Sequence, residues 1–347
     1  MTAAVTAAPP VRSIRWLPGF ILLAAIWGSS FLFIKVGVRE LHPMYLTLGR
    51  CVSGALTLLV VLVVTRDRLP RDPKLWGHLA VLGAIGVAIP HTLFGYGEER
   101  VSSVLAGIWN AVTPLVVLPV AVLAFRTERM TARRTAGLLT GFVGVLVVLG
   151  AWQGIGGAAL TGQLMCFAAA ACYGVAIPYL RRFVAGRAET GVSVSAAQLL
   201  LATGQLAIIA PLAAGAPPVP TRLSADVIGS VLALGILGTG LAFVINLRNI
   251  ELIGATGAST VTYVIPVFAV FIGVIALDEH VSWYQPVGAL IVLLGVAVSQ
   301  GLLFRPKRAV EPDGQPRELA HAASSSADQV LTIRSGGTPQ SAARSQP

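Results

Sequence analysis

The sequence predicts an all-α membrane protein with ten transmembrane helices as two inverted five-helix repeats. Three observations predict this fold class. Only 12% of the residues are charged, whereas soluble domains carry about 25%. Long apolar runs recur from Leu17 to Phe304, which a single N-terminal signal peptide cannot explain. A pattern of one glutamate and two glycines that begins just before the fifth run also recurs, with equal spacing, at the tenth run.

The apolar runs give ten candidate membrane spans. A helix needs about 20 mostly apolar residues to cross a hydrocarbon core near 30 Å. The first five runs lie near residues 17–38, 43–64, 75–97, 101–125 and 131–149. The second five lie near residues 161–179, 193–215, 225–246, 255–277 and 286–304. The connections are short, which fits a compact helical bundle.

Lysine and arginine predict the orientation of these spans. If the N-terminus is cytoplasmic, 17 basic residues near membrane ends fall on the cytoplasmic side and three, Arg39, Arg100 and Arg222, fall outside. Positive charge gathers in cytoplasmic loops. We therefore expect both termini in the cytoplasm of a bacterial cell and a multi-pass protein of its plasma membrane.

These boundaries divide the chain into five parts. We expect a disordered cytoplasmic N-terminus over 1–16, a first repeat over 17–149 and an external linker over 150–160. A second repeat follows over 161–304, and a cytoplasmic tail over 305–347 is rich in Ser, Ala, Gly and Pro and is predicted to be disordered.

Two composition features are weaker signals. The net charge of +10 would suggest nucleic-acid binding in a soluble protein, but the basic residues are confined to short segments between apolar runs, so we expect no nucleic-acid partner. Cys51, Cys166 and Cys172 all lie inside apolar runs, without metal or redox spacing. We expect them to be packing residues and predict no metal site and no cofactor.

The two halves of the chain repeat each other. The matched pairs are Glu128 with Glu279, Gly137 with Gly288, Gly144 with Gly295, Arg50 with Gln198 and, one residue out of register, Pro114 with Pro266. Each half has five spans, and an odd number forces the halves into opposite orientations. Many secondary transporters use such inverted repeats, with the substrate site near the membrane midplane between them.

These residues resemble a known family. The segment Trp27-Gly28-Ser29-Ser30-Phe31, with Lys35, Arg50 and the duplicated Pro, Glu and Gly pattern, is similar to ten-helix EamA-type members of the drug/metabolite transporter superfamily. The resemblance covers roughly residues 17 to 304. It implies export or exchange of small metabolites, often amino acids or drugs, without ATP.

Polar groups inside a membrane are costly, so each one is a candidate for function. Arg50 has no acidic residue in its own span, and its guanidinium needs acceptors such as helix carbonyls or a substrate carboxylate. His91 follows Pro90 and is the candidate for proton coupling, although it could also be a neutral packing residue. Lys35 could snorkel to the interface or pair with Glu98 or Glu99.

The predicted substrate cavity combines these residues with other polar and aromatic groups near the middle of the spans. Its candidates are Trp27, Ser30, Arg50, His91, Tyr96, Asn110, Tyr173, Gln198, Thr262 and Tyr263. The alternative role for Ser, Thr and Asn is bonding between helices. Asn110 and Tyr263 precede Pro114 and Pro266, where proline frees a carbonyl about one turn earlier. Glu128 and Glu279 are expected to cap a following helix or to pair with arginine.

The leading hypothesis is a secondary transporter that exports a small metabolite, amino acid or drug by alternating access, with proton coupling or simple exchange. The expected partners are a small-molecule substrate and the lipid bilayer, with a homodimer as a candidate assembly. A membrane-embedded enzyme is the first alternative, but every Asp and Glu lies in a terminus, a loop or a span end, so we predict no catalytic residues. A non-transporting scaffold is the second, and it predicts a closed bundle without a central cavity.

Overall fold

The computed structural model describes residues 14–126, 129–150 and 157–301. These residues belong to one compact unit, Met1–Leu303, and the second unit, Phe304–Pro347, lies outside the described residues. Glu128, the predicted tail over 305–347, most of the predicted N-terminal segment over 1–16 and the centre of the predicted linker over 150–160 also lie outside them.

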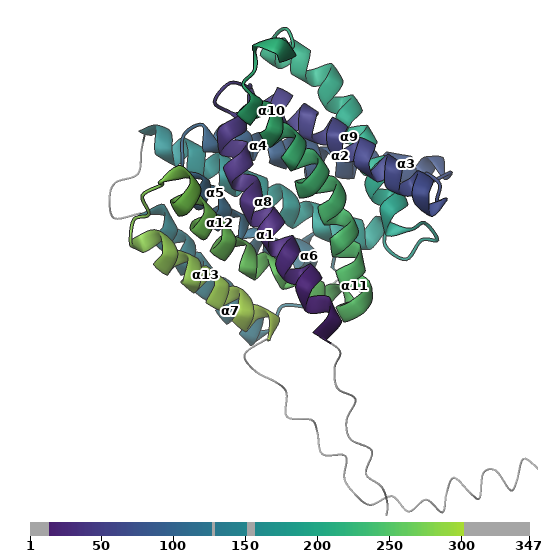
Figure 1. Ribbon diagram of the computed structural model, residues 1–347. Helices are drawn as coiled ribbons and strands as arrows, with labels where there is room; N and C mark the ends of the chain where they lie inside the picture. Colours follow the sequence, from purple (N-terminus) through teal and green to yellow (C-terminus); the bar gives the residue numbers. More distant parts are fainter. Residues whose placement is uncertain (1–13, 127–128, 151–156, 302–347) are drawn as a thin grey trace, which may run out of the picture. The chain divides into compact units, whose positions relative to one another are not determined.

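The first repeat begins with a short 3-10 turn and contains seven α-helices, two pairs of which each form one membrane span. Its elements are η1 (Ile14–Trp16), α1 (Leu17–Gly37), α2 (Pro43–Thr65), α3 (Pro73–Gly83), the π-helical segment η2 (Ala84–Ala88), α4 (Ile89–Glu98), α5 (Ser103–Asn110), α6 (Thr113–Leu123) and α7 (Ala132–Leu149). The segments α3, η2 and α4 run on continuously as the third span, and α5 with α6 forms the fourth (Figure 1).

The second repeat follows the same order. Its elements are α8 (Gly157–Phe183), α9 (Gly191–Ala214), η4 (Pro220–Arg222), α10 (Ala225–Leu232), the π-helical segment η5 (Ala233–Leu241), α11 (Ala242–Ser259), α12 (Val261–Leu277) and α13 (Tyr284–Gln300). Gly254 has φ 75° and ψ 163°, which breaks α11 near its end and separates the eighth span from the ninth.

The predicted fold class is confirmed. Nine helical segments among the described residues are long and apolar enough to cross a membrane, and α13 is a shorter apolar helix. Most span ends fall within about three residues of the prediction. The eighth span is the largest exception, because its helix continues past the predicted end at residue 246 to Gly254. Arg248 and Glu251 end the apolar run there, but they do not end the helix.

The two repeats pack against each other through equivalent pairs of helices. Helix α1 packs on α12, and α8 packs on α5 and α6. Helix α2 packs on η5, while α9 packs on α3 and η2. First spans therefore contact fourth spans of the other repeat, and second spans contact third spans. This exchange is what two inverted copies of one unit produce.

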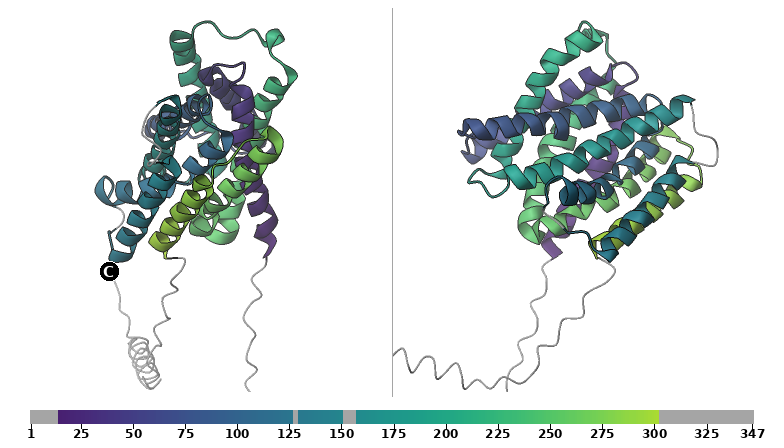
Figure 2. Two further views of the ribbon diagram at one scale, coloured as in Figure 1. Left: turned by 90° about the vertical axis from the view of Figure 1, so that its left-hand side faces the viewer. Right: turned by 180° about the vertical axis from the view of Figure 1, so that it is seen from behind.

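The last helices of the repeats, α7 and α13, lie side by side (Figures 1 and 2). Their contact is backbone to backbone. A Cβ atom added at Gly144 would lie 2.6 Å from the Val292 nitrogen, and one added at Gly288 would lie 2.6 Å from the Val148 nitrogen. In lipid, where apolar burial drives little association, such close approach strengthens van der Waals packing. This explains why both repeats carry glycine at these positions.

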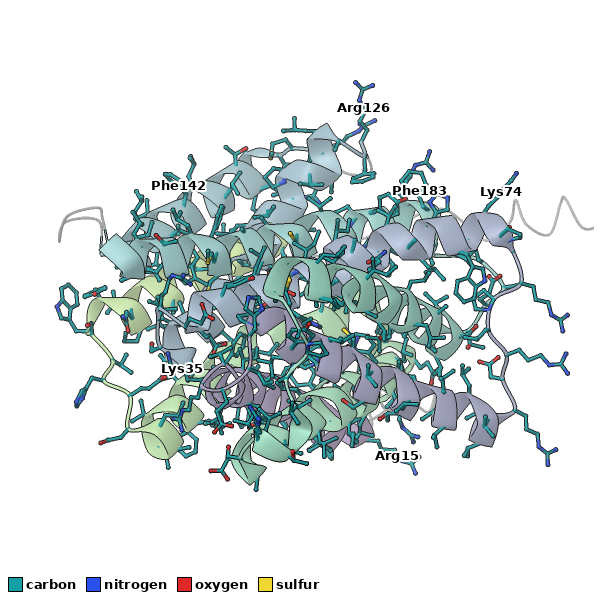
Figure 3. All side chains as sticks on the ribbon, turned by 90° about the horizontal axis from the view of Figure 1, so that it is seen from above. Arg15, Lys35, Lys74, Arg126, Phe142 and Phe183 are labelled. Atoms are coloured by element: carbon teal, nitrogen blue, oxygen red, sulfur yellow. The ribbon has the colours of Figure 1, made fainter. Side chains whose placement is uncertain are left out.

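The outer surface of the bundle is apolar. Leu212 is 83% exposed, Val63 77% and Phe142 57%. The Phe142 side chain on α7 points away from the bundle (Figure 3). An exposed apolar surface of this extent is unfavourable in water, whereas hydrocarbon chains can cover it, as expected of a multi-pass membrane protein.

Candidate functional site

A cavity of about 210 Å³ lies between the repeats. Seven of the ten predicted cavity residues line it: Trp27, Ser30, Arg50, His91, Asn110, Tyr173 and Thr262. They come from both repeats, with α1, α2, α4 and α5 on one side and α8 and α12 on the other. The cavity therefore lies where inverted repeats commonly hold their substrate.

Arg50 is the charged side chain among the residues that line this cavity. It is buried, with 7% of its surface exposed. Its Nε donates a hydrogen bond to Thr239 Oγ1 at 2.9 Å, and Nη2 donates to the Gly238 carbonyl at 3.5 Å. Both acceptors belong to the π-helical segment η5. Arg50 is thus anchored to the opposite repeat at one edge while it faces the cavity.

His91 and Tyr173 lie on the same wall. Their rings meet at 6.3 Å in an edge-to-face arrangement. His91 Nδ1 is buried without a hydrogen-bond partner among the described residues. An unpaired polar atom at the wall of a cavity is available to a bound molecule or water.

Breaks in both fourth spans supply backbone irregularity next to the cavity. Helix α5 ends at Asn110 and α6 begins at Thr113, and both of these residues line the cavity. In the second repeat α11 ends at Ser259 and α12 begins at Val261, directly before the lining residue Thr262. Irregular backbone in a membrane is tolerated where it lines a cavity or is buried in protein.

Three predicted cavity residues lie elsewhere. Tyr96 pairs through its hydroxyl with His42 Nε2 at 3.2 Å. Gln198 is buried and donates from Nε2 to the Leu82 carbonyl at 3.1 Å. Tyr263 packs against the main hydrophobic core beside the cavity residue Thr262. The expectation for Tyr263 relied on Pro266, but α12 continues through that proline and the break comes earlier, at Thr260.

The cavity also has an apolar wall, which was not predicted from the sequence. This wall consists of Phe31, Ile34, Phe94, Ile177, Phe243 and Ile265. Each lies in a helix that is apolar on most faces, so no sequence signal distinguishes a residue that faces the cavity from one that faces lipid. Thr113 and the glycines Gly86 and Gly238 also line the cavity without having been predicted to do so.

A second cavity of about 300 Å³ adjoins the first. The two share Thr113, Ile177 and Thr262 as lining residues. Arg134 and Arg181, near the start of α7 and the end of α8, also line the second cavity. We call this side of the bundle the Arg134 end. The hollow therefore extends from Arg50 toward the Arg134 end.

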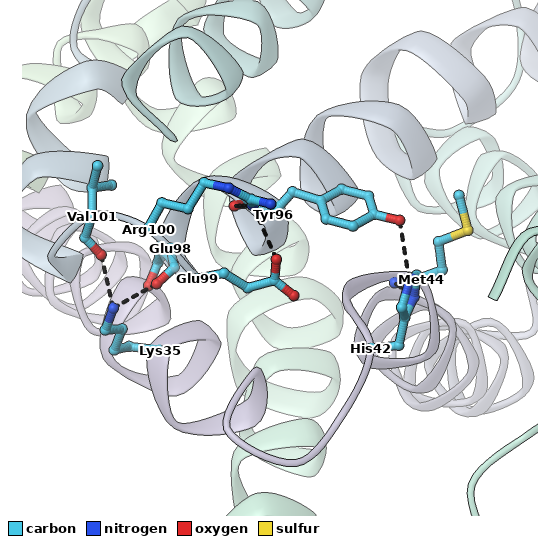
Figure 4. A network of polar contacts seen from close by, with 8 residues as sticks. All are labelled: Lys35, His42, Met44, Tyr96, Glu98, Glu99, Arg100 and Val101. Atoms are coloured by element: carbon cyan, nitrogen blue, oxygen red, sulfur yellow. Dashed lines mark hydrogen bonds and ion pairs between the residues drawn. The ribbon is translucent and has the colours of Figure 1, made fainter. Parts of the chain in front are cut away.

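The opposite side, which we call the Lys35 end, is closed over the first cavity. The buried rings of Phe31 and Phe94 meet at 5.5 Å, edge to face. One turn further, the Lys35 ammonium donates to the carbonyl oxygens of Glu98 at 2.5 Å and Val101 at 2.8 Å (Figure 4). Lys35 is therefore bound to the backbone that joins α4 to α5, neither extended to the interface nor paired with a carboxylate as predicted.

Glu279 adds a second link at the Lys35 end. Its carboxylate accepts hydrogen bonds from Ser103 N at 2.8 Å, Ser103 Oγ at 2.9 Å and Val104 N at 3.0 Å. It caps α5 of the first repeat, not the helix that follows it. Carboxylates stabilise helix N-termini because unpaired N–H groups and the helix dipole meet there. The same contact joins the two repeats.

Loops of the two repeats contact each other at both ends of the bundle. At the Lys35 end the Glu40 carboxylate accepts from Ser224 N at 2.8 Å, and this bond lowers the pKa of Glu40. At the other end Arg187 Nη1 donates to the Asp72 carboxylate at 2.7 Å. Chiefly the bond from Lys74 N, with a smaller contribution from Arg187, lowers the pKa of Asp72. In each case the first loop of one repeat contacts the second loop of the other.

The described residues offer little for a metal. They contain no group of three His, Cys, Asp or Glu side chains that could hold a metal ion. The three cysteines are free, and Cys51 and Cys166 are fully buried. The first cavity therefore presents one guanidinium, a histidine, hydroxyl and amide groups, and an aromatic wall, which suits a small organic solute.

Comparison with known proteins agrees with this geometry. The pattern of the EamA-like transporter family matches residues 14–150 and 160–300, in two copies. An uncharacterized transporter, YoaV, from Bacillus subtilis is 25% identical over 85% of this chain and 99% of its own length. An uncharacterized transporter from Archaeoglobus fulgidus is 27% identical over 82% of this chain and 98% of its own.

A third relative has a more specific name, and one solved structure shares the fold. A protein of Streptantibioticus cattleyicolor named "probable terminal-alkyne amino-acid exporter" is 26% identical over 84% of this chain and 96% of its own. This solved structure is a crystal structure of another protein. It covers 85% of this chain and all of its own, with a TM-score of 0.59 and 23% identity.

Proposed function

The chain belongs to the EamA-like transporter family, and we propose that it exports a small organic solute with a carboxylate group across the bacterial plasma membrane by alternating access. The solute occupies the cavity between the repeats, and its carboxylate binds Arg50. Small metabolites and amino acids are the favoured solutes, because a cavity of about 210 Å³ is smaller than the roughly 300–1,000 Å³ typical of pockets for drug-sized ligands.

The observation that carries this proposal is the unbalanced charge of Arg50. No carboxylate is among the residues that line the first cavity. The hydrogen bonds of the guanidinium within the described residues come from Nε and Nη2, so the planar fork keeps donors for a ligand. Guanidinium binds carboxylates with strong, charge-assisted and often bidentate hydrogen bonds. A bound carboxylate would complete a buried ion pair.

The aromatic wall supports a solute with an apolar part. Trp27, Phe31 and Phe94 line the same cavity as Arg50. Ligand sites commonly combine such apolar walls with a few placed polar groups. The name of the Streptantibioticus cattleyicolor relative, an amino-acid exporter, supports the same class, because amino acids carry both a carboxylate and a side chain.

Charge distribution supports the direction. The Arg134 end carries most of the basic residues of the loops, so the positive-inside rule favours it as the cytoplasmic end. The second cavity opens the path from this end toward Arg50, and Arg134 and Arg181 beside it would attract anionic solutes from the cytoplasm. On this assignment the structure is an inward-facing state with its external end closed.

Proton coupling through His91 is a second part of the proposal. His91 lines the cavity next to Tyr173, and its buried Nδ1 has no hydrogen-bond partner among the described residues, so this ring atom is the candidate for binding a proton. In liposomes, a His91→Gln variant that keeps the full pH dependence of transport would exclude this role. We also propose that the apolar surface contacts lipid directly and that a homodimer can form in the membrane.

The alternatives differ in what they require. A membrane-embedded enzyme needs clustered acids or a His–Asp pair facing one cavity, whereas no Asp or Glu lines either described cavity. A non-transporting scaffold needs a closed core, and the two adjoining cavities count against it.

The test is a screen for accumulation and resistance in cells with and without the protein, followed by flux in liposomes. Carboxylates with apolar side chains are expected to accumulate less in cells that express it. The matched control for variants of cavity residues is Gln205→Ala. Gln205 on α9 donates a hydrogen bond to the Ala80 carbonyl and lines neither described cavity. Absence of flux for every carboxylate tested would contradict the proposal.

A further inference from the structure

The carboxyl group of Glu98 is buried without a partner. Glu98 is the last residue of α4, and its exposed fraction is 0%. Neither Oε1 nor Oε2 has a hydrogen-bond partner among the described residues. An ionised carboxylate in such a place is costly unless it is paired and hydrogen-bonded.

The titratable and charged groups that interact electrostatically with Glu98 come from several neighbouring parts of the bundle. They are Lys35 on α1, Arg50 on α2, Cys166 on α8 and Glu279 after α12. Directly after Glu98 in the chain, Glu99 and Arg100 form an exposed ion pair at 3.0 Å. Helix α5, which follows, places the uncharged Ser103 and Val104 nearby, both already bound to Glu279.

The hydrogen bonds of these neighbours are made elsewhere. The Lys35 ammonium donates to the backbone carbonyls of Glu98 and Val101, and no hydrogen bond joins it to the Glu98 carboxyl group (Figure 4). The Glu279 carboxylate is bound by three donors of α5. An ionised Glu98 would be expected to attract the ammonium into a direct pair. The observed arrangement instead fits a neutral carboxyl group beside one ammonium and one carboxylate.

The position of Glu98 connects it to the closure of the Lys35 end. Its own carbonyl is one of the two oxygens that hold Lys35, so α1 and α4 cannot separate without changing the surroundings of its side chain. Phe94, one turn earlier on α4, lines the cavity. Opening this end would bring water to a carboxyl group that the closed state keeps dry.

We propose that Glu98 is a proton-binding site of the transport cycle, protonated while the Lys35 end is closed and deprotonated when that end opens to water. On closing, the carboxylate takes one proton from the water it was exposed to; on opening, the carboxyl group returns one proton. This inference rests on the alternating access proposed above. Because the proton is taken up and released at the same end, Glu98 makes closure of that end depend on pH without carrying protons across the membrane.

Infrared spectroscopy of the purified full chain in a detergent without ester groups tests the proton directly, without a substrate. The wild-type protein is expected to show the C=O absorption of a protonated carboxyl group at neutral pH. Glu98→Gln should remove this absorption, whereas Glu99→Gln, which changes the exposed neighbour, should keep it. A wild-type spectrum without the absorption, or a Glu98→Gln spectrum that retains it, would overturn the proposal. The wild-type measurement is decisive even if the Glu98→Gln variant does not fold.

Transport in liposomes gives the second arm, with the solute found in the cellular screen as the probe. A one-proton step shifts the closing equilibrium by up to about tenfold per pH unit, so wild-type flux should depend on the pH at the Lys35 end. Glu98→Gln should reduce this dependence, leaving only the contribution proposed for His91, and Glu99→Gln should keep it in full. Undiminished pH dependence of flux in Glu98→Gln rejects the proton site alone. Absence of flux in the wild type rejects the proposed function and leaves the infrared result to decide the proton site.

Discussion

Arg50 in α2 and Gln198 in α9 occupy corresponding positions in the two repeats, and they perform the same structural task with different chemistry. Both are buried and both donate hydrogen bonds to the third span of the other repeat. Arg50 binds Gly238 and Thr239 within η5, and Gln198 binds the Leu82 carbonyl just before η2. Arg50 also lines the first cavity, whereas Gln198 lines neither described cavity.

The π-helical segments explain why a donor is needed at both places. A π-helical turn changes the i→i−4 pattern of the backbone and is frequent at functional sites. Thr239 Oγ1 donates to the Leu234 carbonyl, five residues earlier, and accepts from Arg50. The repeated scaffold thus requires a buried donor on each second span. One repeat meets this need with a neutral amide and the other with a charge, and that charge is the asymmetry on which the proposed substrate class depends.

Both repeats contribute alike to the contact between α7 and α13, and breaking this contact should give the largest loss of stability. Gly144→Leu or Gly288→Leu forces α7 and α13 apart, because even a Cβ there would lie 2.6 Å from a backbone nitrogen. We expect a loss of about 3 kcal/mol or more, at the upper end of overpacking effects. Thermal unfolding in detergent measures it. Gly204→Leu is the control, since nothing lies within 4 Å of a Cβ there; equal stability of all three variants would refute the shared contact.

Replacing the charge makes the two repeats alike. Arg50→Gln keeps a donor at the position of Nε, which bonds Thr239 Oγ1, but removes the cation. Flux of the carboxylate solute should therefore fall about 10- to 100-fold, from the roughly 1.5–3 kcal/mol of a hydrogen bond to a charged group. The measurement is flux in liposomes, and it requires that the variant has the thermal stability of the wild type. Unchanged flux would mean that Arg50 is an anchor like Gln198 and nothing more.

A substitution of Gln198 in the second repeat should lower the stability of the protein but leave transport unchanged. Gln198→Leu leaves the Leu82 carbonyl without its side-chain donor, which should cost about 1–3 kcal/mol. Flux per folded molecule should remain near that of the wild type. A drop in flux as large as that of Arg50→Gln would show that the two second spans share the substrate site equally.

The loop contacts should give the smallest effect. The folded-state pKa of Glu40 and of Asp72 is lowered by hydrogen bonds, so each group stabilises the fold at pH above its unfolded pKa. This contribution is lost as the pH falls through the lowered folded-state pKa. Glu40→Gln and Asp72→Asn should each flatten the dependence of the unfolding temperature on pH in the acidic range. Identical pH profiles for wild type and variants would contradict the contribution of these loops.

Much of the fold could be predicted from sequence because lipid imposes a simple rule. Each span must be long, apolar and helical, so span ends such as those of 17–38 and 43–64 were close to the observed helices α1 and α2. The π-helical segments were not predicted, since Ala84–Ala88 and Ala233–Leu241 have the same apolar composition as regular helix. The burial of Glu98 was missed because its neighbours Glu99 and Arg100 made the segment resemble a loop.

The candidate site was partly predictable for the same reason. Polar residues stand out in an apolar span, so Arg50, His91 and Asn110 could be found. Apolar wall residues such as Phe31 and Phe243 could not, because lipid and the protein interior accept the same side chains. Of the two neighbouring candidates Thr262 lines the cavity and Tyr263 does not, because the backbone break occurs at Thr260 and not at Pro266.

The most direct test of the substrate site compares binding of the identified carboxylate solute with binding of its carboxamide analogue, in wild type and in Arg50→Gln, by titration calorimetry on the purified protein. The wild type should bind the carboxylate at least about tenfold more tightly than the amide, corresponding to about 1.4 kcal/mol. Arg50→Gln should bind the two alike. Undiminished preference for the carboxylate in Arg50→Gln would contradict the assignment of Arg50 as the group that holds the solute.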